Sequence, residues 1–278
     1  MFKILRTIFA AAALLLVLAA AWFYFFKAPA AYNVLVLGTD EVEKSSRHSD
    51  TIILACGNLK EKKLSIMSIP RDSLVEYSGK YMKINTVYAA NYIKGGHYKA
   101  CNEVRKLTEK ITGVSIPFFL QADYGGVREL VDLFGGVKVD ITKRMHYTDK
   151  ADGLFIDFKP GVQVLNGKDA VKYLRFRSDA MADLGRIERQ QKFLVSFLEK
   201  AKAGVSVEKL PKIYGIIKKN VNTNIPPGDL LSVYRAYKDF RLSGTKRFTL
   251  PGEPALIDGS SYWKPDVWQG RKILRQEN

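Results

Sequence analysis

The stretch Asn33-Val-Leu-Val-Leu-Gly-Thr-Asp40 decides the fold class, because four consecutive apolar residues run directly into a polar loop. The stretches Thr51-Ile-Ile-Leu54 and Leu64-Ser-Ile-Met-Ser-Ile69 follow it and have the same apolar character. Near-continuous apolar runs of this length are typical of strands that are buried on both faces of a sheet. We therefore expect a central sheet that begins with these three strands.

Segments with the periodicity of amphipathic helices alternate with strands along the rest of the chain. In residues 98–111, for example, apolar side chains recur at the spacing of one helix face. Further helices are expected at 124–133, 167–173, 183–202, 207–219 and 228–240, and further strands at 117–121, 137–141, 153–158 and 247–250. We expect residues 253–266 to form a loop and the C-terminal residues beyond it to be peripheral. This alternation predicts one α/β domain, with α/β/α layers around a central mixed β-sheet.

The N-terminus has the pattern of a membrane anchor. Residues 8–26 contain no charged side chain and as a helix would span about 28 Å, close to the hydrocarbon thickness of a bilayer. Lys3 and Arg6 favour a cytoplasmic N-terminus. We expect a cytoplasmic segment 1–7, a transmembrane helix 8–26, a short linker 27–31 and an extracytoplasmic domain 32–278. The alternative is a cleaved signal peptide, with Ala28-Pro29-Ala30 as the cleavage motif.

The charge of the chain is strongly positive. Forty-four Lys and Arg residues face 28 Asp and Glu residues, which gives +16 over 278 residues. Without Lys3, Arg6 and Lys27, 41 basic residues still face 28 acidic ones, so the part after residue 27 carries +13. Such a domain favours polyanions: nucleic acid, anionic lipid headgroups or phosphorylated polymers. An extracytoplasmic position argues against nucleic acid and, with the short linker, favours substrates carried by lipid.

The residues from Arg175 to Gln190 hold four arginines in sixteen positions. In extended chain Arg175 and Arg177 would point the same way, and Asp183 is placed to cap a following helix. On that helix Asp183, Arg186 and Gln190 share one face. Guanidinium groups bind phosphate oxygens in a bidentate manner, and a helix N-terminus also attracts anions. The alternative is that these arginines form ordinary ion pairs with Asp179, Asp183 and Glu188.

Asp40 follows one expected strand and Asp50 opens the next. Antiparallel pairing of these strands would place both carboxylates at one edge of the sheet, where they could share a hard cation such as Mg²⁺. The alternative role for two loop aspartates is turn capping.

Cys56 and Cys101 are the only cysteines and form neither a disulfide framework nor a metal-binding spacing. One disulfide is possible in an oxidising compartment, but we favour two buried thiols that act as small apolar residues. No Ser/His/Asp or Cys/His constellation suggests a protein nucleophile, so direct transfer is the expected course of any group transfer.

Taken together, seven stretches resemble the LytR-CpsA-Psr family of cell-envelope proteins, most closely over residues 33–202. They are Asn-Val-Leu-Val-Leu-Gly-Thr-Asp (33–40), Arg-His-Ser-Asp-Thr-Ile-Ile-Leu (47–54), Leu-Ser-Ile-Met-Ser-Ile-Pro-Arg-Asp (64–72), Lys-Ile-Asn-Thr-Val-Tyr-Ala (83–89), Leu-Val-Asp-Leu-Phe-Gly-Gly-Val (130–137), Tyr-Leu-Arg-Phe-Arg (173–177) and Asp-Leu-Gly-Arg-Ile-Glu-Arg-Gln-Gln (183–191). Their order and the single N-terminal apolar segment also fit that family.

The resemblance implies a membrane-bound phosphotransferase. Family members move a glycopolymer, such as teichoic acid or capsule, from a polyprenyl-pyrophosphate carrier to a sugar hydroxyl of peptidoglycan. The carrier's lipid tail runs into an apolar pocket of the domain. Asp40 and Asp50 match the family's Mg²⁺-associated aspartates, and the positions that hold pyrophosphate correspond to Arg47, Arg71, Lys83, Arg175, Arg177, Arg186 and Gln190.

These residue types suit phosphoryl transfer, which needs positioning and charge stabilisation more than covalent help. We expect Arg71, Arg175 and Arg177 to act on the transferred group, together with Asp183. Asp72 and Asp183 are each candidates for the base that accepts the proton of the acceptor hydroxyl, although we favour a role in orienting arginines. The alternatives are a non-catalytic polyprenyl-phosphate-binding or regulatory protein, and a polyprenyl-pyrophosphate hydrolase.

Overall fold

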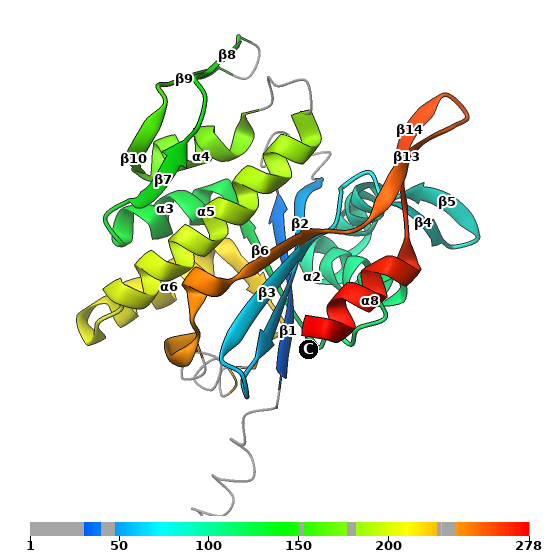
Figure 1. Ribbon diagram of the computed structural model, residues 1–278, viewed down its shortest axis with the longest axis horizontal. Coiled ribbons are helices and arrows are strands. Elements are labelled where there is room, and N and C mark those ends of the chain that lie inside the picture. Colours follow the sequence, from blue (N-terminus) through cyan, green and yellow to red (C-terminus); the bar gives the residue numbers. More distant parts are fainter. Residues whose placement is uncertain are drawn as a thin grey trace, which may run out of the picture.

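A six-stranded mixed sheet forms the centre of the protein (Figure 1). The computed structural model describes residues 31–39, 48–150, 153–176, 182–226, 229 and 237–277, without the side chains of 31, 182, 183 and 207. The strand order is β11 (Val221–Thr223), β6 (Phe118–Asp123), β1 (Ala31–Thr39), β2 (Ser49–Asn58), β3 (Lys63–Ser68) and β12 (Lys246–Thr249). The pairs β1–β6 and β3–β12 are parallel, whereas β1–β2, β2–β3 and β6–β11 are antiparallel. The predicted central mixed sheet is confirmed.

Helices cover both faces of the sheet, because alternate strand residues are apolar on both sides. Leu35 and Leu37 of β1 face the core that is shared with α2 (Ile84–Thr112) and α8 (Val267–Glu277). Ile53 and Ile66 point the other way, toward α5 (Ala182–Gly204). Figure 1 shows α2 and α8 on one side of the sheet and α5 on the other. The layered α/β/α arrangement is therefore as predicted.

A second apolar cluster lies beside α5 and is built by the middle of the chain. Its elements are α3 (Tyr124–Leu133), β7 (Val137–Ile141), β8 (Met145–Asp149), β9 (Leu154–Phe158), β10 (Gly161–Leu165) and α4 (Gly167–Arg175). The strands form the antiparallel pairs β7–β10 and β8–β9 outside the central sheet. Val139, Ile156 and Tyr173 are buried together with Phe193 of α5, so this cluster joins α4 to α5.

The structure corrects several expectations. Residues predicted as a loop form a hairpin, β13 (Gly252–Ile257) and β14 (Ser260–Pro265), and a second unpredicted hairpin is β4 (Leu74–Tyr77) with β5 (Lys80–Lys83). Both turns carry the signal that could have revealed them, since Asp258-Gly259 and Ser78-Gly79 have positive φ at both positions. Helix α2 starts at Ile84 rather than at residue 98 and is kinked at Gly95 and Gly96. The C-terminal residues are not peripheral either, because Leu274 of α8 is buried in the core.

The remaining short elements are η1 (Val207–Lys209), α6 (Leu210–Asn220) and η2 (Leu242–Gly244). Of the expected helix 228–240 only a few residues are described, and 237–239 are helical. Cys56 and Cys101 are buried free thiols, as expected. The predicted membrane helix 8–26 lies outside the described residues. Within the part of the chain that the structure describes, we find no helix with the length and apolar character needed to cross a membrane.

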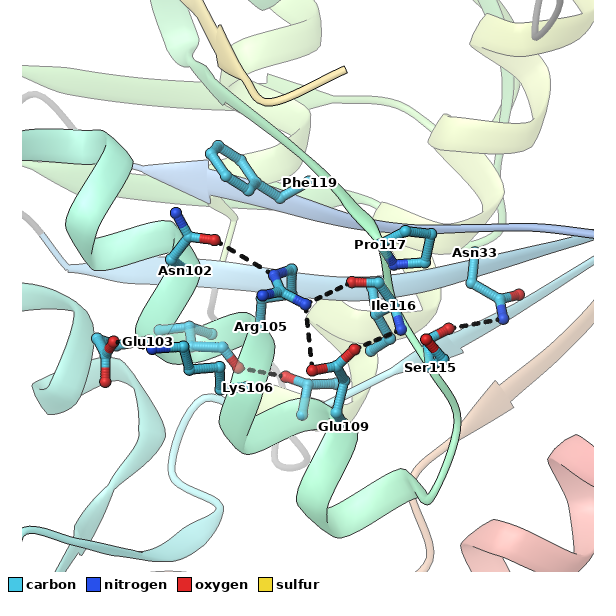
Figure 2. Close-up of polar contacts among 12 residues, drawn as sticks. Asn33, Asn102, Glu103, Arg105, Lys106, Glu109, Ser115, Ile116, Pro117 and Phe119 are labelled. Carbon is cyan, nitrogen blue, oxygen red and sulfur yellow. Dashed lines mark hydrogen bonds and ion pairs between the residues drawn. The ribbon is translucent and has the colours of Figure 1, made fainter. Parts of the chain in front are cut away.

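The connection between α2 and β6 is fixed by polar side chains (Figure 2). The Arg105 guanidinium donates from Nη1 to the Ile116 carbonyl at 2.8 Å and lies 3.1 Å from the Glu109 carboxylate. Glu109 in turn accepts a 2.6 Å hydrogen bond from the Ile116 amide, and Asn33 of β1 donates to the Ser115 carbonyl. Arg105 and Glu109 thus form a clamp that satisfies both backbone polar groups of Ile116 and positions the start of β6.

Candidate functional site

One edge of the central sheet collects the ends of its parallel strands. The register pairs Thr39 of β1 with Asp123 of β6, and Ser68 of β3 with Thr249 of β12, so all four strands finish at the same edge. Because β2 is antiparallel to β1, its start at Ser49 lies opposite Thr39. In open α/β sheets the carboxyl edge of the strands is the usual place for a ligand.

Four charged side chains at this edge, Asp50, Arg71, Asp72 and Lys83, are linked by ion pairs into a charged chain. Arg71, three residues beyond β3, places Nη1 2.8 Å from Oδ1 of Asp50 in β2. Its Nε lies 3.7 Å from Asp72 Oδ2, and Lys83 Nζ lies 3.1 Å from Asp72 Oδ1. All four side chains are partly exposed, between 14% and 30%, so solvent can reach them. The structure therefore brings together three of the predicted site residues, Asp50, Arg71 and Lys83, with Asp72 between the two cations.

Helix α5 brings two more predicted residues toward the same edge. The buried Gln191 amide donates to Ser68 Oγ at 2.9 Å and to the Phe248 carbonyl at 2.6 Å, which fastens α5 to the last residues of β3 and β12. Gln190 and Arg186 are buried within the preceding helical turn and a half. Gln191 was not predicted as a site residue, although a polar side chain beside the sheet-facing Leu194 is a signal for such an anchor.

Arg175 reaches this edge from the middle cluster. Its guanidinium carbon lies 5.9 Å from the ring centroid of Tyr124, which directly follows the last residue of β6. Arg175 is the final residue of α4, not part of an extended Arg-Phe-Arg segment, so the expectation of an extended pair with Arg177 is wrong for Arg175. The reason is packing: Tyr173 and Leu174 of this apolar turn are buried in the core of the middle cluster.

Several predicted residues cannot be placed. Asp40, Arg47 and Arg177 lie outside the described residues. Asp183 is described only in its backbone, as the second residue of a helix that begins at Ala182, one position before the predicted start. The strand pairing expected to bring Asp40 and Asp50 to one edge is present up to the pair Thr39 and Ser49.

The predicted magnesium site is represented in the described residues by Asp50. Across these residues no group of three His, Cys, Asp or Glu side chains is close enough to hold a metal by itself. Mg²⁺ is commonly bound through one or two carboxylates together with substrate phosphates and water. An ionised carboxylate has about four acceptor sites, so one carboxylate can pair with an arginine and also serve as a ligand to a cation. The donor chemistry of this position fits Mg²⁺.

Two layers of helices around a mixed sheet, with basic side chains at the carboxyl edge of the sheet, define the protein as a layered α/β/α domain with a candidate site for anions. The model of the LytR_cpsA_psr family matches residues 21–278, and the chain belongs to this family. The match includes the whole described domain, so it confirms the resemblance found in the seven sequence stretches.

Individual relatives agree with this assignment. The chain is 31% identical over 238 residues to the polyisoprenyl-teichoic acid–peptidoglycan teichoic acid transferase TagU of Bacillus licheniformis, covering 84% of this chain and 73% of that protein. It is 30% identical over 218 residues to the regulatory protein MsrR of Staphylococcus aureus, covering 77% of this chain and 62% of MsrR. The crystal structure of Bacillus subtilis TagV superimposes with a TM-score of 0.73 at 26% identity, over 88% of this chain and 96% of that one.

Proposed function

We propose that the protein is a phosphotransferase that moves a glycopolymer from a polyprenyl-pyrophosphate carrier to a sugar hydroxyl of peptidoglycan. Family membership and the similarity to the teichoic acid transferase TagU support the reaction class. The observation that carries the proposal is the charged chain Asp50–Arg71–Asp72–Lys83 at the carboxyl edge of the sheet. Arg175 and Arg186 add positive charge from two further elements.

In the proposed reaction the acceptor hydroxyl oxygen attacks the phosphorus that carries the glycopolymer. The bond from this phosphorus to the bridging oxygen breaks, polyprenyl phosphate leaves, and the hydroxyl proton passes to a base. Arg71, Lys83 and Arg175 hold the pyrophosphate and neutralise the charge that develops on its oxygens. Mg²⁺ held by Asp50 and the predicted ligand Asp40 would polarise the leaving phosphate.

We assign Asp72 an orienting role rather than that of the base. Its two carboxylate oxygens face different cations, Arg71 at 3.7 Å and Lys83 at 3.1 Å. Both oxygens are therefore engaged in holding Arg71 and Lys83 in place. Asp183 keeps both predicted roles, base and orienting residue, and an Asp183→Asn variant tests them: if Asp183 is the base, the variant should lose the acidic limb of the pH–rate profile.

The proposed setting is a membrane with one span at residues 8–26, a cytoplasmic N-terminus and the domain outside the cell. The expected partners are the lipid-linked glycopolymer, the peptidoglycan acceptor and the membrane, without nucleic acid. A reporter enzyme that works only outside the cytoplasm should be active when it is fused after Asn278. A reporter that works only in the cytoplasm would contradict this topology and reopen the nucleic-acid alternative.

The direct test is transfer by the full chain in detergent, supplied with Mg²⁺, a polyprenyl-pyrophosphate oligosaccharide and peptidoglycan oligomers. We expect a covalent adduct by mass spectrometry, and a loss of about 10²-fold in rate for Arg71→Ala or Arg175→Ala. Arg144→Ala is the matched control, because Arg144 is 62% exposed and pairs with Asp157 on the β8–β9 hairpin. Equal rates for all three variants would overturn the site assignment.

A second candidate function is a binding or regulatory role, which the similarity to the regulatory protein MsrR favours. It predicts that polyprenyl-linked lipid is retained during purification, that no adduct forms, and that replacing Asp50 changes nothing. A hydrolase would release polyprenyl phosphate from the same substrate when peptidoglycan is left out. Mass spectrometry of the lipid in each reaction separates the three functions.

A further inference from the structure

The C-terminal hairpin β13–β14 contacts the charged chain of the candidate site. The Trp263 amide donates to the Asp72 carbonyl at 3.0 Å, and Ser73 forms a parallel β-bridge with Trp263. The Trp263 indole donates to the Leu250 carbonyl at 3.1 Å, which ties the hairpin to the end of the central sheet. Figure 1 shows β13–β14 alongside β4–β5 on the same side of the sheet. The hairpin therefore lies beside the site and brings residues that are distant in sequence into contact with it.

Lys83 is held between this hairpin and Asp72. Its ammonium nitrogen lies 3.1 Å from Asp72 Oδ1 and 5.6 Å from the ring centroid of Tyr262. The backbone of Lys83 is also constrained, because Lys83 pairs with Leu74 across the β4–β5 hairpin and precedes the first turn of α2. A lysine side chain is otherwise a flexible stem whose ordering costs entropy when it binds a phosphate.

A carboxylate alone would hold Lys83 poorly for anion binding. Asp72 attracts the ammonium, but it also competes with an incoming phosphate for the same charge. An aromatic ring attracts the cation through its quadrupole and carries no formal charge of its own. Tyr262 can therefore restrict the ammonium without neutralising it.

We propose that Tyr262 is a positioning residue that holds Lys83 for pyrophosphate binding. This inference rests on the proposed function, in which Lys83 binds the pyrophosphate. It assigns the C-terminal hairpin a part in substrate recognition, through one aromatic ring and the backbone contact at Asp72.

The test is a double-mutant cycle, with inorganic pyrophosphate and Mg²⁺ titrated into the full chain by calorimetry. Tyr262→Leu should weaken binding about two- to five-fold, the range of a partly exposed cation–π contact. Tyr262→Phe keeps the ring and should bind like the wild type. In a Lys83→Ala background, Tyr262→Leu should have no further effect, because the ring acts only through the ammonium. Tyr81→Leu is the control, since Tyr81 lies on β5 and is 70% exposed.

The outcomes separate this inference from the proposed function. If Tyr262→Leu weakens binding equally with and without Lys83, or if Tyr262→Phe fails to restore it, the positioning role is wrong. If Lys83→Ala binds like the wild type while Arg71→Ala does not, the inference also fails and the pyrophosphate site survives. If neither Lys83→Ala nor Arg71→Ala weakens binding, the pyrophosphate site itself is rejected. Thermal melts of each variant confirm that the compared proteins are folded.

Discussion

Arg71 and Asp50 are joined by a 2.8 Å contact from Nη1 to Oδ1, which links the loop after β3 to the second residue of β2. The backbone strengthens the same junction, because the Ile69 amide donates to the Ile52 carbonyl at 2.8 Å. A predicted phosphate ligand and a predicted metal ligand therefore orient each other before substrate arrives. Such preorganisation is what electrostatic catalysis of phosphoryl transfer requires.

A substitution at Asp50 can separate its two proposed roles, which are to pair with Arg71 and to bind Mg²⁺. Asp50→Asn keeps an oxygen that accepts from Arg71 but removes the negative charge that a cation needs. We expect transfer to fall by about 10²-fold at low Mg²⁺ and to recover in part at high Mg²⁺. Folding stability should decrease by only about 1 kcal/mol, because the pair is partly exposed. Rates measured across a Mg²⁺ series test this, and an unchanged Mg²⁺ dependence would remove Asp50 from the metal site.

Gly167 positions the helix that carries Arg175. A Cβ added there would lie 2.3 Å from the Arg128 carbonyl oxygen, and the Gly167 amide donates to Asp132 Oδ1 at 2.7 Å. Gly167→Ala must push α4 away from α3, so we expect a loss of about 1–3 kcal/mol in unfolding free energy and reduced transfer.

The matched control is Gly215 in α6, where an added Cβ meets no atom within 4 Å. Gly215→Ala should leave activity unchanged and stabilise the helix by about 0.5–1 kcal/mol. Urea unfolding of both variants gives the comparison. Similar stabilities for the two would show that the approach of α3 to α4 is not tightly packed.

Glu109 should matter more for stability than its neighbour Glu103. Glu109→Ala leaves the Ile116 amide without its 2.6 Å acceptor and Arg105 without a charged partner, as Figure 2 shows. We expect a loss of about 1–3 kcal/mol in unfolding free energy. Glu103 pairs with the exposed Lys106, so Glu103→Ala should cost no more than about 0.5 kcal/mol. An equal effect of both substitutions on the urea midpoint would argue against the clamp.

Burial raises the pKa of the Cys101 thiol to about 12, from an ordinary value of 9.0. A group whose pKa is raised by folding contributes stability below its unfolded pKa and loses it as the pH rises through the folded value. Stability should therefore fall between pH 9 and 12. Burial also raises the pKa of the Tyr173 hydroxyl, which acts in the same direction.

Comparison with Cys101→Ala isolates the thiol, because Tyr173 remains in both proteins. The variant should show a shallower decline of unfolding free energy above pH 9. In the wild type at pH 8, alkylation of Cys101 should be slow when the protein is folded and fast in denaturant. Rapid alkylation of the folded protein would contradict the burial.

The local elements of this protein follow from short-range patterns in its sequence. Apolar runs at 34–37 and 52–54 determine strands that are buried on both faces, and helix-period patterns determine α3 and the long α5. The hairpins β4–β5 and β13–β14 were not predicted, because their strands are half exposed and lack a clear apolar pattern. Their turns nevertheless contain the required glycines.

Only the tertiary structure decided which charges meet. The sequence alone selects Asp50, Arg71, Lys83 and Arg175 by type and motif, but it contains no distance between segments separated by loops. Strand register brings Asp50 to Arg71, and the packing of α4 under Tyr124 brings Arg175 to the same edge. The contact of Tyr262 with Lys83 joins residues that are far apart in the sequence. Such contacts depend on how whole layers pack, since each local segment is compatible with many relative placements until the shared core excludes all but one.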